Sequence, residues 1–487
     1  MSDSNHSLEQ DSGGPTTRAS DTIMHRLAHV TNCAELIVEA GAINGNADAV
    51  ILPDDRITYV ELLAGARRWA HDLIALGVGK GEHVGILLPN SNNYMQALFG
   101  VMLVGAAPVP INVRYRGQEI AALAADARLT TIILTNEEGQ FVNFTDRINE
   151  AFQGLAKAEN PFRLSLAETP HLRHIIVAEG DAPKGFIRRD DVADIAVGAD
   201  EIDRRWRSLA PEDTALILYT SGSTSRPKGC LLSHRALLNQ GRLMAGRYKM
   251  TARDRIWAPL PMFHVGGISP MIAIALAGGA FLSMPRMEPG PSLAMMANER
   301  ATISYVLFQT IIADLLQHPD FGKYDFSAVR LMISNPSMQP PWICDLLAER
   351  LPGAIQIGTF GMTETVGAAC THSPDDAADD RLHRLGRPLP GVEVRIVDES
   401  GEDVATGAIG QVLLRGPSLF SGYYNDAEKT ASAMLGGWFH TGDRGSLSAG
   451  GSIMFHGRCK DVLKVGGENV GALEVETVIG MHPVTAT

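Results

Sequence analysis

Residues 219–229 read YTSGSTSRPKG and combine hydroxyl side chains, two glycines and one lysine in a short segment. Hydroxyl groups donate hydrogen bonds, Gly222 and Gly229 allow backbone N–H groups to turn toward an anion, and Lys228 adds a point charge. This chemistry suits a polyphosphate. The segment is not a Walker A loop, because its lysine stands in Pro-Lys-Gly and not in Gly-Lys-Ser/Thr. The alternative is a solvated Ser/Gly turn that happens to contain a lysine.

Four further segments follow in a fixed order, and each is a weak signal alone. They are residues 261–267 (PMFHVGG), 359–364 (TFGMTE), 438–443 (WFHTGD), and 457–461 (GRCKD) continued by 466–469 (GGEN). Together with the first segment they resemble the signature of the adenylate-forming superfamily, which includes acyl- and aryl-CoA synthetases, peptide-synthetase adenylation domains and beetle luciferases. The resemblance covers about residues 23 to 487. It implies ATP-dependent activation of a small carboxylic acid to an acyl-adenylate, followed by transfer to CoA.

The resemblance implies a phosphate and metal site. The β- and γ-phosphates of ATP would be held by Thr220, Ser221, Gly222, Ser223, Thr224 and Lys228. Thr363 would hydrogen-bond the α-phosphate, and Glu364 would bind Mg²⁺, a hard cation that prefers oxygen ligands. Lys228, Thr363, Glu364 and His264 are the predicted catalytic residues. The alternative for Glu364 is a surface carboxylate that follows a turn.

The resemblance also implies a nucleoside site. Phe360 stands where the family usually has tyrosine and would stack on adenine, with Gly361 and Ser337 beside the nucleotide. Asp443 and Arg458 would hold the ribose hydroxyls. The alternative for Asp443 is an ordinary turn aspartate in Thr-Gly-Asp.

His264 resembles the family histidine at the mouth of the acid pocket. We expect it to position the substrate carboxylate without transferring a proton, because a carboxylate nucleophile needs no general base. The alternative is a buried histidine with satisfied hydrogen bonds. The resemblance further assigns Gly267, Gln309, Asn335 and Gly358 to the acid pocket.

Several positions depart from the family pattern and leave the acid open. Ser225 replaces a glycine, residues 335–338 (NPSM) replace Gly-Gly-Ala-Pro, and residues 308–310 (FQT) replace Val-Pro-Thr. Small residues are expected to leave room in the pocket at Gly266, Gly267, Gly358 and Thr359, while Asn335, Ser337 and Gln309 bring polar groups. This combination predicts a medium or bulky acid with a polar group. Alternatively, the polar groups pair internally and the acid is an ordinary fatty or aromatic one.

Lys460 matches the family's hinge between the large domain and a small C-terminal domain. The family carries a lysine near the end of that domain, but no lysine follows Lys464, and the sequence stops at Thr487. We therefore expect a truncated or cleaved enzyme that binds ATP with Mg²⁺ but adenylates poorly. A natural degenerate homologue is the alternative.

Two rivals accompany the acyl-CoA ligase hypothesis. An amino-acid-activating domain usually has Phe-Asp where this chain has Phe263-His264, which favours an acid without an α-amine. A non-catalytic adenylate-binding protein fits less well, because the implied phosphate, metal and ribose positions are all present. A carrier-protein thiol in place of CoA stays open.

Composition indicates a soluble globular protein with two or three domains. Of the 487 residues, 45% are hydrophobic and 20% are charged. The net charge of −13 argues against nucleic-acid binding. The five cysteines, Cys33, Cys230, Cys344, Cys370 and Cys459, form no CxxC pair and suit a reducing, cytoplasmic compartment. The uncharged run 265–284 contains a Gly-Gly stop, so we expect a helix and a short strand there and no membrane span. A homodimer is a candidate assembly.

The pattern of elements predicts an α/β fold. Residues 58–77 read as a capped amphipathic helix, 84–88, 131–134, 175–177 and 215–218 read as buried strands, and helices are expected after Ser91 and from about Ser233. Strands that alternate with helices indicate parallel β-α units. The stretches 136–165 and 178–210 read as irregular, and 375–380 reads as a solvated acidic loop. The predicted division is a disordered tail (1–22), a large N-terminal adenylation domain (23–456) whose residues 386–456 form an antiparallel β subdomain, and a hinge with the start of a C-terminal domain (457–487).

Overall fold

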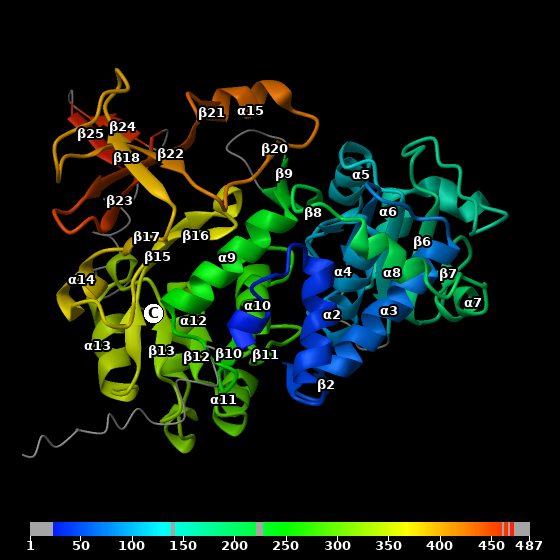
Figure 1. The fold of residues 1–487 in the computed structure, drawn as a ribbon, viewed down its shortest axis with the longest axis horizontal. Helices are drawn as coiled ribbons and strands as arrows, with labels where there is room; N and C mark the ends of the chain where they lie inside the picture. The colour runs from blue at the N-terminus through cyan, green and yellow to red at the C-terminus, as the bar shows by residue number, and fades with distance from the viewer. Residues whose placement is uncertain (1–22, 138–141, 221–226, 460–461, 466–467, 472–487) are drawn as a thin grey trace, which may run out of the picture.

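Residues 23–137, 142–220, 227–459, 462–465 and 468–471 are described by the computed structural model. They form an α/β fold in which two parallel sheets are sandwiched by helices and antiparallel sheets cover one end (Figure 1). The predicted α/β class is therefore confirmed.

The first parallel sheet has five strands in the order β4-β3-β5-β6-β7. Its strands are β3 (His83–Leu87), β4 (Ala107–Pro110), β5 (Thr131–Asn136), β6 (His174–Gly180) and β7 (Ile187–Arg188). The apolar runs predicted as strands at 84–88, 131–134 and 175–177 all lie in this sheet, since a strand covered on both faces is apolar throughout.

The second sheet has seven strands in the order β14-β13-β12-β10-β11-β1-β2, and only β2 runs antiparallel to its neighbour. Its strands are β1 (Asp48–Ile51), β2 (Arg56–Thr58), β10 (Arg255–Trp257), β11 (Ala280–Leu282), β12 (Ile303–Tyr305), β13 (Leu331–Ile333) and β14 (Ile355–Ile357). β12, β13 and β14 are adjacent and parallel, so their carboxyl ends share one edge.

The buried apolar residues form three core clusters around these sheets. The central core lies between the sheets, a second core lies under α5 and α6, and a third lies under α11, α12 and α13. α4 and α10 are buried along almost their whole length, as expected for helices that are apolar all round. The helices are α2 (Cys33–Asn44), α3 (Tyr59–Ala75), α4 (Asn92–Val104), α5 (Gly117–Asp126), α6 (Phe144–Ala151), α7 (Asp190–Ala193), α8 (Glu201–Arg207), α9 (His234–Arg247), α10 (Val265–Ala277), α11 (Pro289–Asn298), α12 (Gln309–Gln317), α13 (Pro341–Arg350), α14 (Ala378–His383) and α15 (Ala427–Ala433), with 3-10 turns η1 (Gln153–Lys157), η2 (Phe321–Lys323), η3 (Pro336–Met338) and η4 (Thr363–Thr365).

The predicted helix caps are confirmed. Thr58 and Glu61 form a reciprocal capping box at the start of α3. Ser91 caps α4, and Ser233 caps α9 through hydrogen bonds to backbone N–H groups. The predicted helix, Gly-Gly stop and strand over 265–284 are α10, Gly278 in the left-handed conformation and β11.

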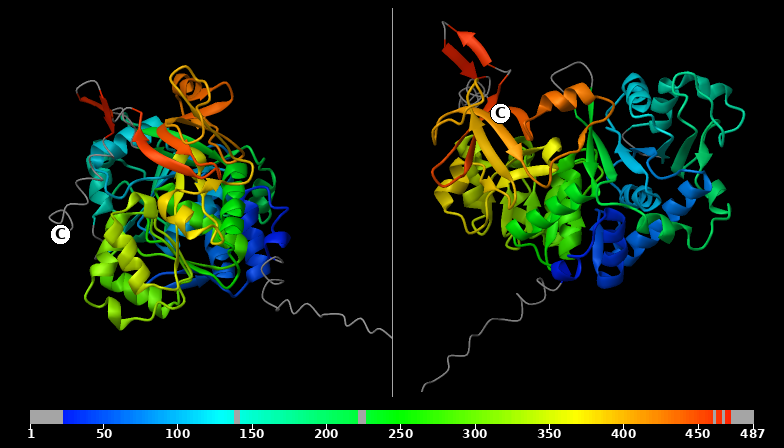
Figure 2. Two further views of the ribbon diagram at one scale, coloured as in Figure 1. Left: turned by 90° about the vertical axis from the view of Figure 1, so that its left-hand side faces the viewer. Right: turned by 45° about the horizontal axis from the view of Figure 1, so that its top comes forward.

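Antiparallel strands dominate the C-terminal part, as the alternation after residue 386 predicts. A five-stranded sheet contains β18 (Glu393–Val397), β19 (Gly410–Arg415), β21 (Met434–Leu435), β22 (Trp438–Leu447) and β23 (Ile453–Arg458). Two smaller sheets contain β15 (Thr359–Met362), β16 (Gly367–Thr371) and β17 (Arg387–Pro388), and β24 (Val462–Val465) with β25 (Glu468–Gly471). Figure 2 shows these sheets at one end of the molecule. The domain boundaries stay a prediction.

One expectation about loops is wrong. The stretches predicted as irregular contain α6, α7 and α8. Helix α8 buries only Trp206, so its apolar period is too weak to read, and an ion pair between Glu201 and Arg205 lies along it. The interpretation of 375–380 as a solvated segment holds for Asp375 and Asp379, whose side chains are exposed. Asp380 is half-buried, and its carboxylate pairs with Arg384 and accepts a hydrogen bond from the Ser452 hydroxyl.

Across the described residues, none of the helices has the length and apolarity needed to span a bilayer.

Candidate active site

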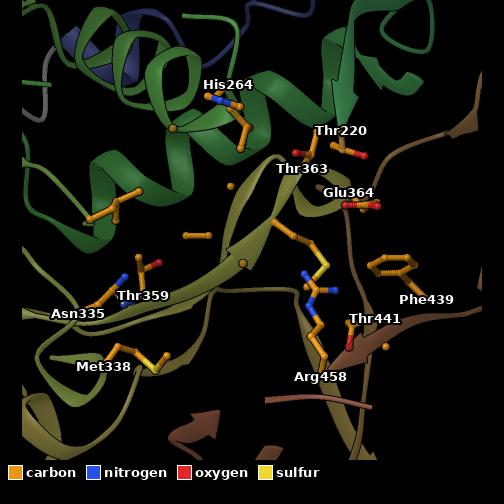
Figure 3. Close-up of a pocket in the computed structure, with 18 of the residues that line it drawn as sticks. Thr220, His264, Asn335, Met338, Thr359, Thr363, Glu364, Phe439, Thr441 and Arg458 are labelled. Atoms are coloured by element: carbon orange, nitrogen blue, oxygen red, sulfur yellow. Dashed lines mark hydrogen bonds between the residues drawn. The ribbon is translucent and has the colours of Figure 1, made fainter. Parts of the chain in front are cut away.

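A cavity of about 1240 Å³ opens where the parallel and antiparallel sheets meet. Its wall is built from the hairpin of β8 (Thr214–Thr220) and β9 (Lys228–Ser233), the first turn of α10, the carboxyl ends of β12 to β14, η4, and strands β22 and β23. The cavity joins Thr220, His264, Glu364, Thr441 and Arg458, residues that lie far apart in the sequence (Figure 3). Five separate sequence signals therefore meet in one site.

The phosphate segment is the loop of a β-hairpin. β8 (Thr214–Thr220) and β9 (Lys228–Ser233) pair antiparallel, so Thr220 stands directly opposite Lys228. Both residues line the cavity. The other predicted phosphate ligands, Ser221, Gly222, Ser223 and Thr224, and also Ser225, lie outside the described residues. Strand β9 between the loop and α9 was not predicted.

Tyr423 is a site residue that the sequence did not reveal. It belongs to β20 (Gly422–Tyr423), which pairs with β9 from almost 200 positions earlier in the chain. Its hydroxyl donates a 2.8 Å hydrogen bond to Glu364 Oε1, and Lys228 Nζ lies 5.2 Å from the centre of its ring. Tyr423 therefore holds the two predicted charged groups in relation to each other. An isolated tyrosine after glycine carries no local signal for this role.

Glu364 could hold a divalent cation. η4 turns the chain after β15 and presents Thr363 and Glu364 to the cavity. Tyr423 occupies one carboxylate oxygen and leaves the other for a cation. No group of three or more His, Cys, Asp or Glu side chains gathers as a metal site among the described residues. The donor set suits Mg²⁺, which is commonly bound by one carboxylate together with substrate phosphates.

Asp443 and Arg458 form a pair at the other end of the cavity. They face each other across β22 and β23, with Arg458 Nε 2.9 Å from Asp443 Oδ1. Oδ1 is buried, and the guanidinium is not aligned to donate a hydrogen bond to it. A buried acceptor that has no donor among the described residues fits the ribose hydroxyls that the sequence assigned to this pair.

Burial raises the pKa of Asp443 to about 6, and the charge of Arg458 opposes this rise. Between pH 5 and pH 7 the carboxyl group ionises, and both oxygens become acceptors. We expect adenosine, which has no titrating phosphate, to bind roughly fivefold more tightly at pH 7 than at pH 5, since hydrogen bonds to charged groups are about 1 kcal/mol stronger. Calorimetric titration of the protein and of Asp443→Asn measures this. A wild-type affinity that is as flat with pH as that of the variant would contradict the assignment.

His264 precedes α10 and is exposed toward the cavity. Partial desolvation and the charge of Arg114 lower its pKa, so the ring is neutral at pH 7. Its side chain makes no capping hydrogen bond to α10. The alternative of a buried, satisfied histidine is therefore wrong, and the neutral ring is available to position a carboxylate.

At two of the positions where a small residue was expected to leave room in the acid pocket, glycine is present for another reason. A Cβ atom at Gly267 would lie 2.7 Å from the Pro261 carbonyl oxygen, and one at Gly358 would lie 2.7 Å from the Arg384 carbonyl oxygen. Neither glycine lines the cavity, so both are small because two backbone segments approach closely. Gly266 and Thr359 do line it.

Of the predicted polar residues of the acid pocket, two line the cavity and one does not. Asn335 and Gln309 line the cavity, and Gln309 is exposed at the start of α12. Ser337 does not line it, and its hydroxyl donates to the Arg384 carbonyl at 3.3 Å. Several lining residues were not predicted: Tyr305, Leu307, Met338, Thr441 and Cys459.

Gly361 lines the cavity, whereas the neighbouring Phe360 is only 5% exposed and packs with its ring centre 6.2 Å from that of Phe455. The pairing of β15 with β16 shifts register between these two residues, so they differ in exposure. Stacking of Phe360 on adenine stays a prediction. The hinge residue Lys460 lies outside the described residues.

Comparison with known proteins identifies the family. The family described as AMP-binding enzyme matches residues 38–424. The indoleacetate–CoA ligase of Aromatoleum aromaticum is 30% identical over 451 residues, covering 92% of this chain and 83% of that protein. A 3-[(3aS,4S,7aS)-7a-methyl-1,5-dioxo-octahydro-1H-inden-4-yl]propanoyl:CoA ligase of Mycobacterium tuberculosis is 33% identical over 434 residues, covering 88% and 80%.

Solved structures give the same result. The anthranilate CoA ligase AuaEII in complex with anthranoyl-AMP has a TM-score of 0.79 and 26% identity, covering 93% of this chain and 82% of that one. The matching family spans the phosphate hairpin, His264, Glu364 and Tyr423. The chain therefore belongs to the AMP-binding enzyme family, within the adenylate-forming superfamily.

Proposed function

We propose that this protein is an AMP-forming acid–thiol ligase whose chemistry takes place in the cavity between Lys228, Glu364 and His264. Family membership carries the general activity, which is ATP-dependent activation of a carboxylic acid and transfer to CoA. The observation that supports the detailed assignment is the meeting of a lysine, a carboxylate and a neutral histidine in one cavity.

In the first half-reaction a carboxylate oxygen of the acid attacks the α-phosphorus of ATP, and the bond to pyrophosphate breaks. Negative charge moves onto the leaving pyrophosphate, so the protein acts mainly by positioning and by neutralising charge. Lys228 faces this charge, and Thr363 donates to the α-phosphate. Mg²⁺ on Glu364 would neutralise phosphate charge. His264 orients the acid.

In the second half-reaction the thiol sulfur attacks the acyl carbonyl carbon, AMP departs, and the thiol proton is lost. CoA is the proposed acceptor, because the matched relatives are named CoA ligases. We propose a cytoplasmic location for the protein. Light scattering tests whether it forms a homodimer. Poor adenylation by this chain stays a prediction.

The relatives differ in their acids. Their names describe ligases for indoleacetate, for a dioxo-indenyl propanoate and for long-chain fatty acids. An amino-acid-activating enzyme is a weaker candidate, since His264, and not an aspartate, lines the cavity where a substrate amine would need a counter-charge.

Hydroxamate trapping of the adenylate with a panel of straight-chain, aromatic, hydroxylated and polycyclic acids tests the function. We expect pyrophosphate release and a hydroxamate with at least one acid, and a CoA thioester when hydroxylamine is replaced by CoA. Release of pyrophosphate only with amino acids would support the rival assignment.

Substitution of Lys228 by alanine should weaken ATP binding without unfolding the hairpin, because the lysine side chain is only partly buried. One charge-assisted contact to phosphate contributes roughly 1.5–3 kcal/mol, about 10- to 150-fold in affinity. Calorimetry with ATP measures the change, and adenosine, which lacks phosphate, is the control ligand. An equal loss for both ligands would contradict the phosphate assignment.

A further inference from the structure

One wall of the cavity is the shared carboxyl edge of β12, β13 and β14. Tyr305 is the last residue of β12 and pairs with Ile333, the last residue of β13. Asn335 follows β13 by two positions, and Thr359 follows β14 by two. Tyr305, Asn335 and Thr359 all line the cavity. Ligands of parallel sheets bind at this edge, because the strand ends bring side chains from several strands together.

Asn335 presents its amide nitrogen with a fixed orientation. Its backbone is left-handed, with φ of 55°, a conformation that asparagine tolerates better than most residues. Its Oδ1 accepts a 2.7 Å hydrogen bond from the backbone N–H of Thr359, which identifies the oxygen end of the amide. Among the described residues, Nδ2 has no hydrogen-bond partner. Two N–H donors are therefore left for something in the cavity.

Tyr305 supplies a second donor on the same edge. The residue is only 2% exposed, yet it lines the cavity, and within the described part of the chain its hydroxyl has no hydrogen-bond partner. Burial raises the pKa of Tyr305 well above its ordinary value, so the hydroxyl keeps its proton. The nearby buried Tyr248 is different, because its hydroxyl pairs with Thr371 Oγ1 at 3.1 Å. Buried tyrosines usually have such a partner.

Apolar side chains make up much of this wall, although Gln309, Ser334 and Gln339 also line it. Val265, Leu307 and Met338 line the cavity around the two donors, and Phe308 stands beside them with 56% of its surface exposed. An unbranched alkyl chain would cover these groups but leave both donors without an acceptor. A carbon skeleton that carries an oxygen acceptor satisfies the apolar wall and the donors together.

We propose, on the basis of the acid–thiol ligase function above, that the acid is a bulky carbon skeleton with a carbonyl or comparable acceptor oxygen, bound by Asn335 Nδ2 and the Tyr305 hydroxyl. The ribose and phosphate of the bound adenylate are assigned to other residues. Arg458 and Glu364 lie across the cavity from Asn335, and the ribose and phosphate contacts assigned to them leave this edge to the acid (Figure 3).

Calorimetric titration with two stable adenylate analogues tests the proposal. The analogues are acylsulfamoyl adenosines that carry 3-(4-oxocyclohexyl)propanoyl or 3-cyclohexylpropanoyl, which differ only in one carbonyl oxygen. We expect the oxo analogue to bind roughly tenfold more tightly, as for a hydrogen bond to an otherwise unpaired buried group. Equal binding, or tighter binding of the analogue without the oxygen, overturns the proposal.

Three variants assign the effect to the wall. Asn335→Asp keeps the acceptor for Thr359 and removes the donors, Asn335→Gly keeps the left-handed backbone without adding charge, and Tyr305→Phe removes one hydroxyl. Each should reduce the preference for the oxo analogue several-fold and leave the affinity for AMP unchanged. Tyr324→Phe, which alters a residue at a separate surface hollow, should change nothing.

The possible outcomes distinguish a failure of the acid assignment from a failure of the ligase function. A parallel loss of AMP affinity in the Asn335 variants would mean that the amide serves the adenine, and the proposal falls while the ligase function stands. Binding of neither analogue and of no AMP would overturn the ligase function, and the acid assignment with it.

Discussion

We expect Glu364→Gln to lower the rate of pyrophosphate release by roughly 10²–10³-fold and to preserve the fold. The amide of glutamine still offers an oxygen to the Tyr423 hydroxyl, so the 2.8 Å hydrogen bond can form. What is lost is the negative charge, and with it the protein ligand proposed for Mg²⁺. The loss acts where charge accumulates on the phosphates, which is why the effect on rate should be large.

Initial rates of pyrophosphate release are measured across a series of Mg²⁺ concentrations. The variant should need more Mg²⁺ for half-maximal rate, which a simple loss of folding would not produce. Glu402→Gln, at an exposed carboxylate after β18, is the matched control and should behave as the parent protein. A variant within twofold of the parent at every Mg²⁺ concentration would show that Glu364 has only the structural contact to Tyr423.

Gly361→Ala is expected to destabilise the protein by about 3 kcal/mol or more, among the larger effects of a single substitution. A Cβ atom at this position would lie 1.7 Å from the Gly367 carbonyl oxygen and 2.6 Å from its carbonyl carbon. The obstruction is backbone, so no side chain can rotate away. β15 and β16 must separate, and η4 with Glu364 lies between them.

Urea unfolding followed by tryptophan fluorescence measures this change. Gly353→Ala is the control, because a Cβ atom there would have no heavy atom within 4 Å. We expect a clear shift of the midpoint for the first variant and almost none for the second. A Gly361→Ala protein as stable as the control variant would mean that the two strands are farther apart than the structure shows.

Local structure and the chemistry of the site were largely predictable from the sequence. The caps at Thr58, Ser91 and Ser233 are short-range hydrogen bonds between residues three positions apart, so the sequence alone carries them. The buried strands show as apolar runs because both faces of a parallel sheet are covered. Lys228, Glu364, His264 and Arg458 were found because each lies in a short segment of characteristic composition, and all four line one cavity.

Contacts between distant segments were decided only by the tertiary structure. The Tyr423–Glu364 hydrogen bond depends on β20 pairing with β9, and the free Asn335 amide depends on where β14 places the Thr359 N–H. Gly267 and Gly358 looked like open space in the acid pocket but are glycines because other backbone passes within 2.7 Å of their Cβ positions. The sequence shows which hydrogen-bonding groups are present. Packing decides which of these groups remain without a partner. For this protein the sequence determined the family chemistry, and the tertiary structure determined the wall that we propose meets the acid, because an unpaired donor is a property of its surroundings.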